Sequence, residues 1–498
     1  MEKETGEVSV KPVLTDEISG KEGTNGLSEA PVVHLKKWRW KSPEVQMMWC
    51  SFLVACTAGL YVAINGLRNN GKINSSTYTQ NTDISTAIGN AVWVLSSLVA
   101  GATLNSLGPR WSMAIGALGY PMYISGFWFY GSVGTEGAKY WIFLVSGLGA
   151  GLLFGFLWAV QNYLVNCYAK ENEKGLYVAL NWSIIKSGAV VGSLIGLCLS
   201  TNLTSNSEAA PWYLYLIFIC INVVAIFGSF FLCDPSEVRR SDNSKVAVFK
   251  KRTLKEELIV LKNALMERRI QLMILPLFCA EVSLAPCSSA NAFIFNVRTK
   301  SLNNLCYWIV QIPGAFILHK ILDRKGVPRK TRAYWGLLYI YVFITATFLG
   351  FYIMYGAWGG ELAFSKSLSS DEYPDIDWTE KRYAGPFIWY LCCGVSFGLL
   401  LNYRLWLIGA MSNDPKVLGT YSGLVPAFQL AGIALAFGIA STTISYTSMF
   451  AIWWVLLMVS LPCMFLVIKY YVTDTNYFKE DDVYVPAEYI EQLKVNET

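Results

Sequence analysis

Residues 44–67, EVQMMWCSFLVACTAGLYVAINGL, form an apolar stretch whose one charged residue, Glu44, stands at its beginning. A helix needs roughly 20 mostly apolar residues to cross the hydrocarbon core of a bilayer. Only helices and closed barrels satisfy every backbone hydrogen bond in that environment. We therefore expect this stretch to form a transmembrane helix.

Apolar stretches of similar length recur along the chain, in which 54% of the residues are hydrophobic and 15% are charged. Hydropathy of this kind is typical of a protein that crosses the membrane many times. We expect eleven further helices, at 84–107, 110–130, 140–165, 176–200, 212–233, 270–297, 304–322, 332–355, 384–408, 415–440 and 446–470. The predicted fold class is an all-α membrane protein with 12 transmembrane helices.

Lysine and arginine residues gather in particular connections between these helices. Residues 234–269 hold ten of them and residues 319–332 hold six, whereas the six connections on the opposite side hold eight in total. Positively charged loops stay on the cytoplasmic side, so we expect both termini to be cytoplasmic, in a plasma membrane or an endomembrane. The N-glycosylation motifs at Asn74 and Asn202 lie in outer connections, where we expect a sugar chain.

Histidine and cysteine residues give no support to enzymatic or metal chemistry. The chain has two histidines, and its 12 cysteines lie within or beside the apolar stretches without a CxxC spacing. Such a pattern predicts neither a disulfide framework nor a zinc site. We therefore expect no enzyme activity, no catalytic residues, no cofactor, no metal and no nucleic-acid partner.

Two parts of the sequence repeat each other in the order of their helices. Asn105 and Gly108, within GATLNSLGPRW, align with Asp323 and Gly326, within HKILDRKGVPRKTR, at an offset of 218 residues. At offsets of 243 or 244 residues, further glycines align as Gly151 with Gly394, Gly155 with Gly398, Gly175 with Gly419 and Gly188 with Gly432. Parallel repeats predict two pseudo-symmetric halves related by an axis along the membrane normal.

The repeat divides the chain into predicted domains. Apolar residues spaced three and four apart within 253–269 also predict an amphipathic helix on the cytoplasmic surface. The predicted division is a cytoplasmic tail at 1–43, a six-helix bundle at 44–233, a cytoplasmic linker with the amphipathic helix at 234–269, a second six-helix bundle at 270–470 and a cytoplasmic tail at 471–498.

The segment DRKGVPRK, with Asp323, Arg324 and Gly326, resembles the signature loop of the major facilitator superfamily. The first copy departs from it, because Asn105 replaces the acid and Pro109-Arg110 follow the glycine. That NSLGPR form, together with NY at 162–163, KG at 174–175 and NWSIIKSGAVVG at 181–192, is similar to the Unc-ninety-three-like (uncoordinated protein) branch, above all to its fungal members. The resemblance covers roughly residues 40–470.

Two functions are compatible with this resemblance. The first is a transporter that moves a small solute or an ion by alternating access, with proton coupling as a further hypothesis. The second is a non-transporting accessory protein that regulates or traffics another membrane protein, as animal members of the branch do. We expect a monomer in the lipid bilayer, with a membrane-protein partner only in the second case.

Lys186 and Glu281 are charged residues near the middle of predicted helices. A charge at the bilayer centre costs about 2.5–3.5 kcal/mol on insertion scales, so each should face protein or water. The functional interpretation makes Glu281 a proton-coupling or cation-binding carboxylate with Lys186 as its counter-charge. The structural interpretation makes them an ion pair, or two charges satisfied separately.

Amide side chains on the predicted helices are candidates for lining the same interior. An amide can bind a solute, yet it can also hydrogen-bond to another helix, for about 0.6 kcal/mol on average. The set comprises Asn65, Gln161, Asn162, Asn181, Asn291, Gln311 and Gln429. Asn162 and Gln311 are the better candidates, because the resemblance places the fourth helix along the cavity and Gln311 precedes Pro313.

Three further patterns concern helix packing and helix ends. Arg404 is expected to extend to the cytoplasmic interface, as long basic side chains near helix ends do. Glycines four residues apart predict close helix contacts within the chain rather than a homodimer face, at 147, 151 and 155 and at 188, 192 and 196. Helix breaks are predicted at Pro276, Pro286 and Pro313.

The two signature loops are candidate gating elements. They contribute Asn105, Gly108, Arg110, Asp323, Arg324, Gly326 and Arg329. Asp323, Arg324 and Arg329 can pair with helix ends in one state and release them as the halves rock. Asn105 carries no charge, so we expect the first loop to form a weaker latch. The alternative is that the positive charges of these loops only fix the orientation of the protein in the membrane. That alternative explains the arginines but not the Asp-x-x-Gly spacing.

Overall fold

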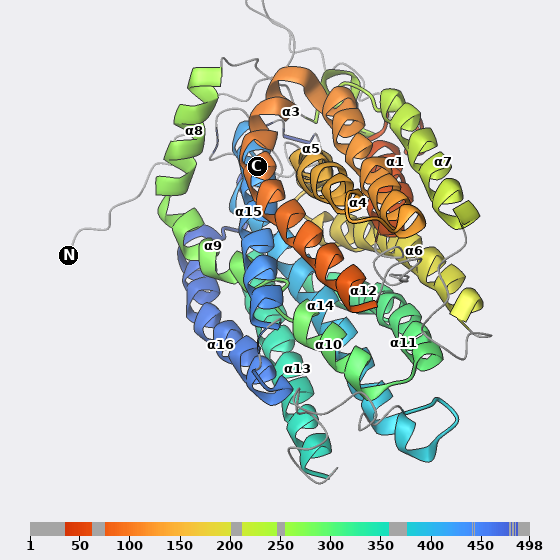
Figure 1. Cartoon of the computed structure of the whole chain (residues 1–498). Helices are drawn as coiled ribbons and strands as arrows, with labels where there is room; N and C mark the ends of the chain where they lie inside the picture. The colour runs from red at the N-terminus through yellow and green to blue at the C-terminus, as the bar shows by residue number, and fades with distance from the viewer. Residues whose placement is uncertain are drawn as a thin grey trace, which may run out of the picture.

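The chain folds into a bundle of long helices, as a computed structural model shows (Figure 1). The structure describes residues 35–61, 75–200, 212–246, 254–357, 376–440, 442, 444–477, 480, 483 and 485–486, and all structural statements refer to these. Within these residues there is no β-strand; two isolated β-bridges join Arg239 to Lys245 and Phe295 to Ile376.

The first part of the bundle runs from Pro43 to Glu237. Its elements are α1 (Pro43–Val54), η1 (Ala55–Gly59), α3 (Ser75–Val133), α4 (Ala138–Trp141), η2 (Ile142–Gly149), α5 (Ala150–Tyr168), α6 (Lys174–Ser200) and α7 (Trp212–Gly228), followed by the short turns η3 (Ser229–Phe231) and η4 (Pro235–Glu237). Both η1 and η2 are π-helical, and each continues directly from the α-helix before it.

The second part begins with α8, which occupies the predicted amphipathic segment. Its elements are α8 (Leu254–Met266), α9 (Arg268–Phe278), α10 (Leu284–Ile294), α11 (Val297–Ile309), α12 (Gln311–Leu322), α13 (Arg329–Ala357), η7 (Lys381–Tyr383), α14 (Ala384–Met411), α15 (Pro415–Ala440) and α16 (Tyr446–Tyr471). On α8, Ala264 is buried, and Leu261 and Leu265 pack against the hydrophobic core.

Nine helical stretches in the described residues are long and apolar enough to cross a membrane. One of them covers Ile84–Val133, where helices were predicted at 84–107 and 110–130. Its 50 residues correspond to about 75 Å of helix, more than twice the hydrocarbon thickness. Large apolar side chains also face outward, for example Val224 and Ile353, which are 70% and 74% exposed. The helices therefore suit an apolar surrounding on both their inner and outer faces.

Two predicted helices are divided in the structure. The stretch predicted at 270–297 consists of α9 and α10 with a non-helical break at Cys279–Ser283, and the stretch at 304–322 consists of α11 and α12, which meet at Val310. Pro286 and Pro313 lie in the first turns of α10 and α12, where a missing N–H costs no hydrogen bond, and Pro276 lies in the last turn of α9. The prolines thus flank the breaks.

The two copies of the signature loop share a backbone conformation. Gly108 and Gly326 have positive φ angles of 77° and 73°, a region that favours glycine. Gly108 turns the chain back within α3, and Gly326 does the same between α12 and α13. The repeat seen in the sequence is therefore present in the backbone.

Corresponding glycines also make corresponding close contacts. A methyl group added at Gly188 of α6 would overlap the carbonyl oxygen of Ala55, where η1 begins. One added at Gly432 of α15 would overlap the carbonyl oxygen of Phe278, where α9 ends. In both halves of the sequence, a glycine thus lies against the point at which a neighbouring helix becomes irregular.

The glycines at 147, 151 and 155 bring η2 and α5 close to α3. A methyl group at Gly147 would lie 3.1 Å from the carbonyl oxygen of Ser85, and one at Gly151 would lie 2.5 Å from that of Gly89. These contacts lie within one chain. They agree with the predicted use of the glycines in intramolecular packing.

Candidate functional site

Lys186 reaches from α6 into a cage of aromatic rings. Its Nζ atom lies 4.2 Å from the ring centroids of both Trp182 and Trp308, and 5.7 Å from that of Phe397. Trp308 belongs to α11 and Phe397 to α14, so the ammonium group of the first half contacts rings of the second. A desolvated cation–π contact contributes about 2 kcal/mol, so two of them offset most of the cost of this charge.

Glu281 lies in the break between α9 and α10. Its backbone carbonyl accepts the N–H of Leu284, but in the described part of the chain its carboxylate has neither a hydrogen bond nor an ion pair within 4.0 Å. The carboxylate interacts electrostatically with Lys186 and with Arg404. Lys186 and Glu281 are therefore electrostatically coupled without a direct ion pair, and the aromatic cage satisfies Lys186 separately.

Arg404 does not extend to the membrane interface, contrary to the prediction. Its side chain is fully buried in the bundle and donates to the carbonyl oxygens of Pro276 at 2.6 Å, Leu277 at 3.3 Å and Leu400 at 3.0 Å. Pro276 and Leu277 end α9, and a cation is favoured at a helix C-terminus. The carbonyl groups at the end of α9 hold Arg404 inside the bundle. The sequence of one helix does not reveal this attraction, because the partners belong to another helix.

Several of the candidate amides are buried, and they differ in their hydrogen bonds. Gln311 donates to the carbonyl oxygen of Tyr307 at 3.1 Å, and its Oε1 atom is buried without a partner in the described residues, as is Oε1 of Gln161. Asn162 is buried, and its carbonyl oxygen accepts from Asn166. Asn291 instead accepts from Asn303, in the middle of α11, at 3.0 Å.

Gln311 belongs to the same cluster as the aromatic cage. A methyl group added at Gly398 would lie 3.2 Å from Cβ of Gln311 and 3.4 Å from Nε1 of Trp182. The indole N–H of Trp182 is buried without a partner in the described residues. An unpaired donor and an unpaired acceptor thus lie around Gly398, next to Lys186.

A second cluster joins the two halves at the end of the bundle where α1 begins and α16 ends, here named the termini end. Asp323 accepts hydrogen bonds from the backbone N–H groups of Gly175 at 3.0 Å and Leu176 at 2.7 Å. These residues open α6, so a carboxylate of the second half caps a helix of the first and is favoured by its dipole. His319 also contacts Asp323, at 3.1 Å.

A buried ion pair strengthens this contact. Arg329 Nη2 lies 2.7 Å from Glu171 Oε2, and the two side chains are 1% and 3% exposed. Beside them, Lys174 donates to Asn413 Oδ1 at 2.7 Å and to the carbonyl oxygen of Gly409. Charged contacts made by residues 171–176 therefore join the two halves of the chain at the termini end.

The first signature loop makes a matching but uncharged contact. A methyl group at Gly175 would lie 2.8 Å from Asp323 Oδ1, and one at Gly419 would lie 3.2 Å from Asn105 Oδ1. Asn105 thus faces α15 as Asp323 faces α6. The other loop residues bind locally: Arg110 donates to the carbonyl oxygen of Leu232, and Arg324 lies 5.6 Å from the ring centroid of Trp335.

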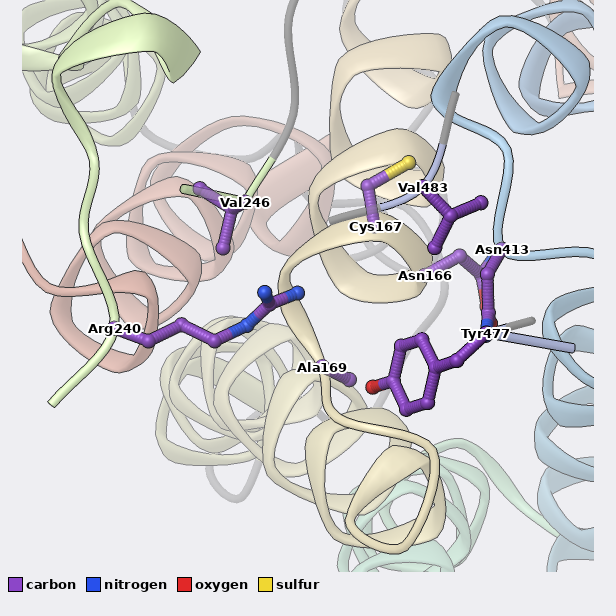
Figure 2. Close-up of a pocket in the computed structure, with 8 residues that line it drawn as sticks. All are labelled: Asn166, Cys167, Ala169, Arg240, Val246, Asn413, Tyr477 and Val483. Atoms are coloured by element: carbon purple, nitrogen blue, oxygen red, sulfur yellow. The ribbon is translucent and has the colours of Figure 1, made fainter. Parts of the chain in front are cut away.

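A small pocket lies at the termini end and not beside Lys186 (Figure 2). Its lining residues are Asn166, Cys167, Ala169, Arg240, Val246, Asn413, Tyr477 and Val483. Figure 2 shows the guanidinium group of Arg240 and the phenol of Tyr477 directed toward the space beside Ala169. Residues that follow α16 therefore form part of the wall of this pocket.

Several partners were not predicted from the sequence. Trp182 precedes Lys186 by one helical turn, a spacing that places both on one face of α6, whereas Trp308 and Phe397 approach only through the tertiary fold. Glu171 and Lys174 belong to the charged stretch KENEKG at 170–175, of which KG at 174–175 contributed only to the family resemblance. Asn65, Asn74 and Asn202 lie outside the described residues.

Among solved structures, the chain is similar to a Major Facilitator Superfamily transporter, FucP, in the outward conformation. The TM-score is 0.58, the sequence identity is 13%, and the match covers 87% of this chain and 100% of that chain. Identity this low shows the fold alone. The protein therefore has the fold of a major facilitator transporter and is a multi-pass integral membrane protein.

Relatives in sequence narrow this class. Residues 76–282 match the family described as "Ion channel regulatory protein UNC-93". An uncharacterized membrane protein of Schizosaccharomyces pombe is 30% identical over 454 residues, which cover 89% of each chain. UNC93-like protein 1 of Arabidopsis thaliana is 28% identical over 446 residues, covering 88% of this chain and 93% of that protein. The chain belongs to the UNC-93-like family, as its signature loops predict.

Proposed function

We propose that this protein is a secondary transporter that moves a small solute or an ion by alternating access, coupled to protons through Glu281. The observation that carries the proposal is the position of the Glu281 carboxylate, which lies in a helix break, has no hydrogen-bonded partner in the described residues and interacts with Lys186. Intramembrane carboxylates of this kind mark ion and proton pathways.

The coupling step follows from the charges. When Glu281 is ionised, its attraction to Lys186 favours the arrangement in which α6 and the break of the second half lie together. Protonation of Glu281 removes that attraction and leaves Lys186 held by its aromatic cage alone. Proton binding therefore shifts the balance between the two arrangements, which is what coupling requires.

The proposed framework has 12 transmembrane helices in two six-helix bundles, at 44–233 and 270–470, with both termini in the cytoplasm. The matching contacts of Gly188 and Gly432 support two parallel repeats. The excess of lysine and arginine in 234–269 and 319–332 supports the orientation. In this orientation Asn74 and Asn202 face outward and are available for glycosylation.

The test compares cells that lack the protein with cells that overexpress it, profiling metabolites and metal ions together. We expect one solute to accumulate with the wild type. In Glu281→Gln, whose amide imitates a permanently protonated carboxyl group, accumulation should be lost while exchange of labelled for unlabelled solute continues. The control, Glu136→Gln, removes an exposed charge near the start of α4 and should accumulate solute normally.

The description of the matching family favours a second function, regulation of another membrane protein. If no solute moves while other membrane proteins change in abundance or location, that function replaces transport. If accumulation is the same in Glu281→Gln and the wild type, transport remains and proton coupling through Glu281 is excluded.

A further inference from the structure

The acid of the second gating loop, Asp323, has the uncharged Asn105 as its counterpart in the first loop, and a carboxylate from another part of the chain lies at the start of α15, the helix that Asn105 faces. Asp323 binds two consecutive backbone N–H groups at the start of α6. Asn105, its counterpart in the repeat, faces α15 with an uncharged amide. Glu480, nine residues after the end of α16, accepts from the backbone N–H groups of Asn413 at 2.6 Å and Asp414 at 3.1 Å.

Asn413 and Asp414 directly precede α15, which begins at Pro415. Each of α6 and α15 thus has two consecutive N–H groups at its start bound by one carboxylate from elsewhere in the chain. The carboxylate comes from the signature loop in one case and from the C-terminal segment in the other. In both cases a negative charge lies at the positive end of a helix dipole.

We propose that Glu480 is a gating residue that takes the place of the acid missing at Asn105, so that the C-terminal segment helps to close the termini end. The inference rests on the proposed alternating-access function, in which this end opens and closes. It assigns to residues 472–477 and to Glu480 a role in the transport cycle in addition to that of a tail.

The contacts of this segment with both halves support the assignment. Asn476 donates its backbone N–H to Glu171 at 2.8 Å and its side chain to the carbonyl oxygen of Ala410 at 3.1 Å. Asp474 accepts the N–H of Arg329 at 2.8 Å. The segment therefore binds both members of the buried Glu171–Arg329 ion pair as well as the end of α14.

Apolar contacts add to the polar ones. Tyr477, Val483 and Val485 are buried together, and Tyr477 and Val483 line the pocket of Figure 2 together with Cys167. The hydroxyl group of Tyr477 also accepts the N–H of Glu171 at 3.2 Å. The boundary between the two halves of the chain at the termini end is here named the seam. Because the segment binds groups on both sides of the seam, part of it must be displaced when the halves separate.

The surroundings of Glu480 are charged on both sides. Burial, opposed by hydrogen bonds from Asn413 and Ser412 and by the nearby Lys174, raises the pKa of Glu480, and Asp414 adds to the rise. Lys174 belongs to the first half and Asp414 to the second. The Glu480 carboxylate therefore attracts Lys174 on the other side of the seam and also binds the start of α15.

The first experiment measures hydrogen–deuterium exchange of the full-length protein in nanodiscs, comparing the wild type with Glu480→Gln. The amides of Asn413 and Asp414 should exchange faster in the variant because they lose a charged acceptor. The decisive measurement is the exchange rate of the amides at the start of α6, which Glu480 does not contact. If Glu480 closes the gate, the amides of Gly175 and Leu176 should also exchange faster, although their own partner, Asp323, is unchanged.

The second experiment is a rescue. Asn105→Asp restores the acid that the first loop lacks, so the double variant Asn105→Asp with Glu480→Gln should return the exchange at Gly175 and Leu176 to near the wild-type rate. Glu136→Gln, exposed and remote from the termini end, is the control for loss of a single carboxylate.

Faster exchange at residues 413–414 alone would reduce Glu480 to a local helix cap and overturn the proposal, as would failure of the rescue. If Glu480→Gln folds poorly, Glu480→Asp provides a shorter carboxylate whose weaker contact should change exchange in the same direction. None of these readouts depends on solute movement, so the result stands apart from the test of transport.

Discussion

At the scale of single residues, the interior charges differ in how the protein satisfies them. Lys186 is surrounded by aromatic faces and Arg404 by carbonyl oxygens. Glu281 has no comparable set of donors in the described residues. A carboxylate can be left without donors at lower cost than a guanidinium, because it can take up a proton. The least satisfied charge is therefore one that proton uptake can neutralise.

Asp377 shows the opposite arrangement, at the end of the bundle remote from the termini. It accepts from Arg298 and Asn296 at 2.6 Å each and from the hydroxyl group of Thr379 at 2.7 Å. The hydrogen bond from Arg298, with those from Asn296 and Thr379, holds the pKa of Asp377 well below its usual range. These contacts fasten residues 376–379 to the start of α11.

The first prediction concerns Asp377→Asn. A depressed carboxyl pKa stabilises the fold above the unfolded value, about 3.9, and that contribution is lost as pH falls through the folded value. Near pH 7 the variant should be less stable by about 1 kcal/mol, since Arg298 is partly exposed and its attraction is screened. Thermal unfolding from pH 7 to below 4 should show the difference shrinking; a difference independent of pH would contradict the assignment.

At the scale of elements, glycine decides how closely the helices approach. The carbonyl oxygens of Ala55 and Phe278 occupy the space that a side chain would need at Gly188 and Gly432. Both carbonyls stand at irregular points, the beginning of a π-helical turn and the end of α9. Close approach and irregular backbone therefore occur together, in each half of the sequence.

The second prediction compares two glycines of α15. Gly432→Ala must displace the backbone of Phe278, so it should destabilise the protein by about 2 kcal/mol or more. Gly438→Ala meets no atom within 4 Å and should be neutral or stabilising by up to about 1 kcal/mol, because alanine is the better helix former. Thermal stability in detergent measures both; equal losses would mean that helix flexibility, and not space, governs the site.

At the scale of the whole molecule, direct charged contacts join the halves at the termini end. The Glu171–Arg329 pair is buried, so removing one partner leaves an uncompensated charge, whereas removing both does not. Lys174 and Asp323 make further contacts across the same seam. Loss of one of these contacts should therefore weaken the closure of the whole termini end.

The third prediction uses Cys167, a buried thiol at this end, as the reporter. Glu171→Gln should weaken closure by about 3 kcal/mol, the cost of leaving Arg329 unpaired, and alkylation of Cys167 by a maleimide should become faster. The double variant Glu171→Gln with Arg329→Gln should react at an intermediate rate. Mass spectrometry resolves each cysteine, and buried Cys393, remote from this end, serves as the internal standard. An unchanged rate at Cys167 would show that the pair does not control closure.

The helices and their order could be predicted from the sequence because each depends on its own run of apolar residues. The signature loops were found for a similar reason: Gly108 and Gly326 are required by local backbone conformation. The cage around Lys186 joins α6, α11 and α14, and the acid at α15 comes from residue 480. Contacts between segments this far apart leave no periodic pattern. Arg404 was misplaced because its partners are carbonyl groups, which every residue possesses.

The two left-handed glycines have a consequence for the chemistry of the chain itself. A methyl group at Gly108 or Gly326 would meet nothing within 4 Å, so neither site lacks space. What each site excludes is the L configuration, because positive φ brings an L side chain against its own backbone. A D-alanine introduced by chemical ligation should therefore be accepted at both turns, and by restricting the unfolded chain it should stabilise them. The loops are selective for the handedness of this residue and do not exclude the volume of a methyl group.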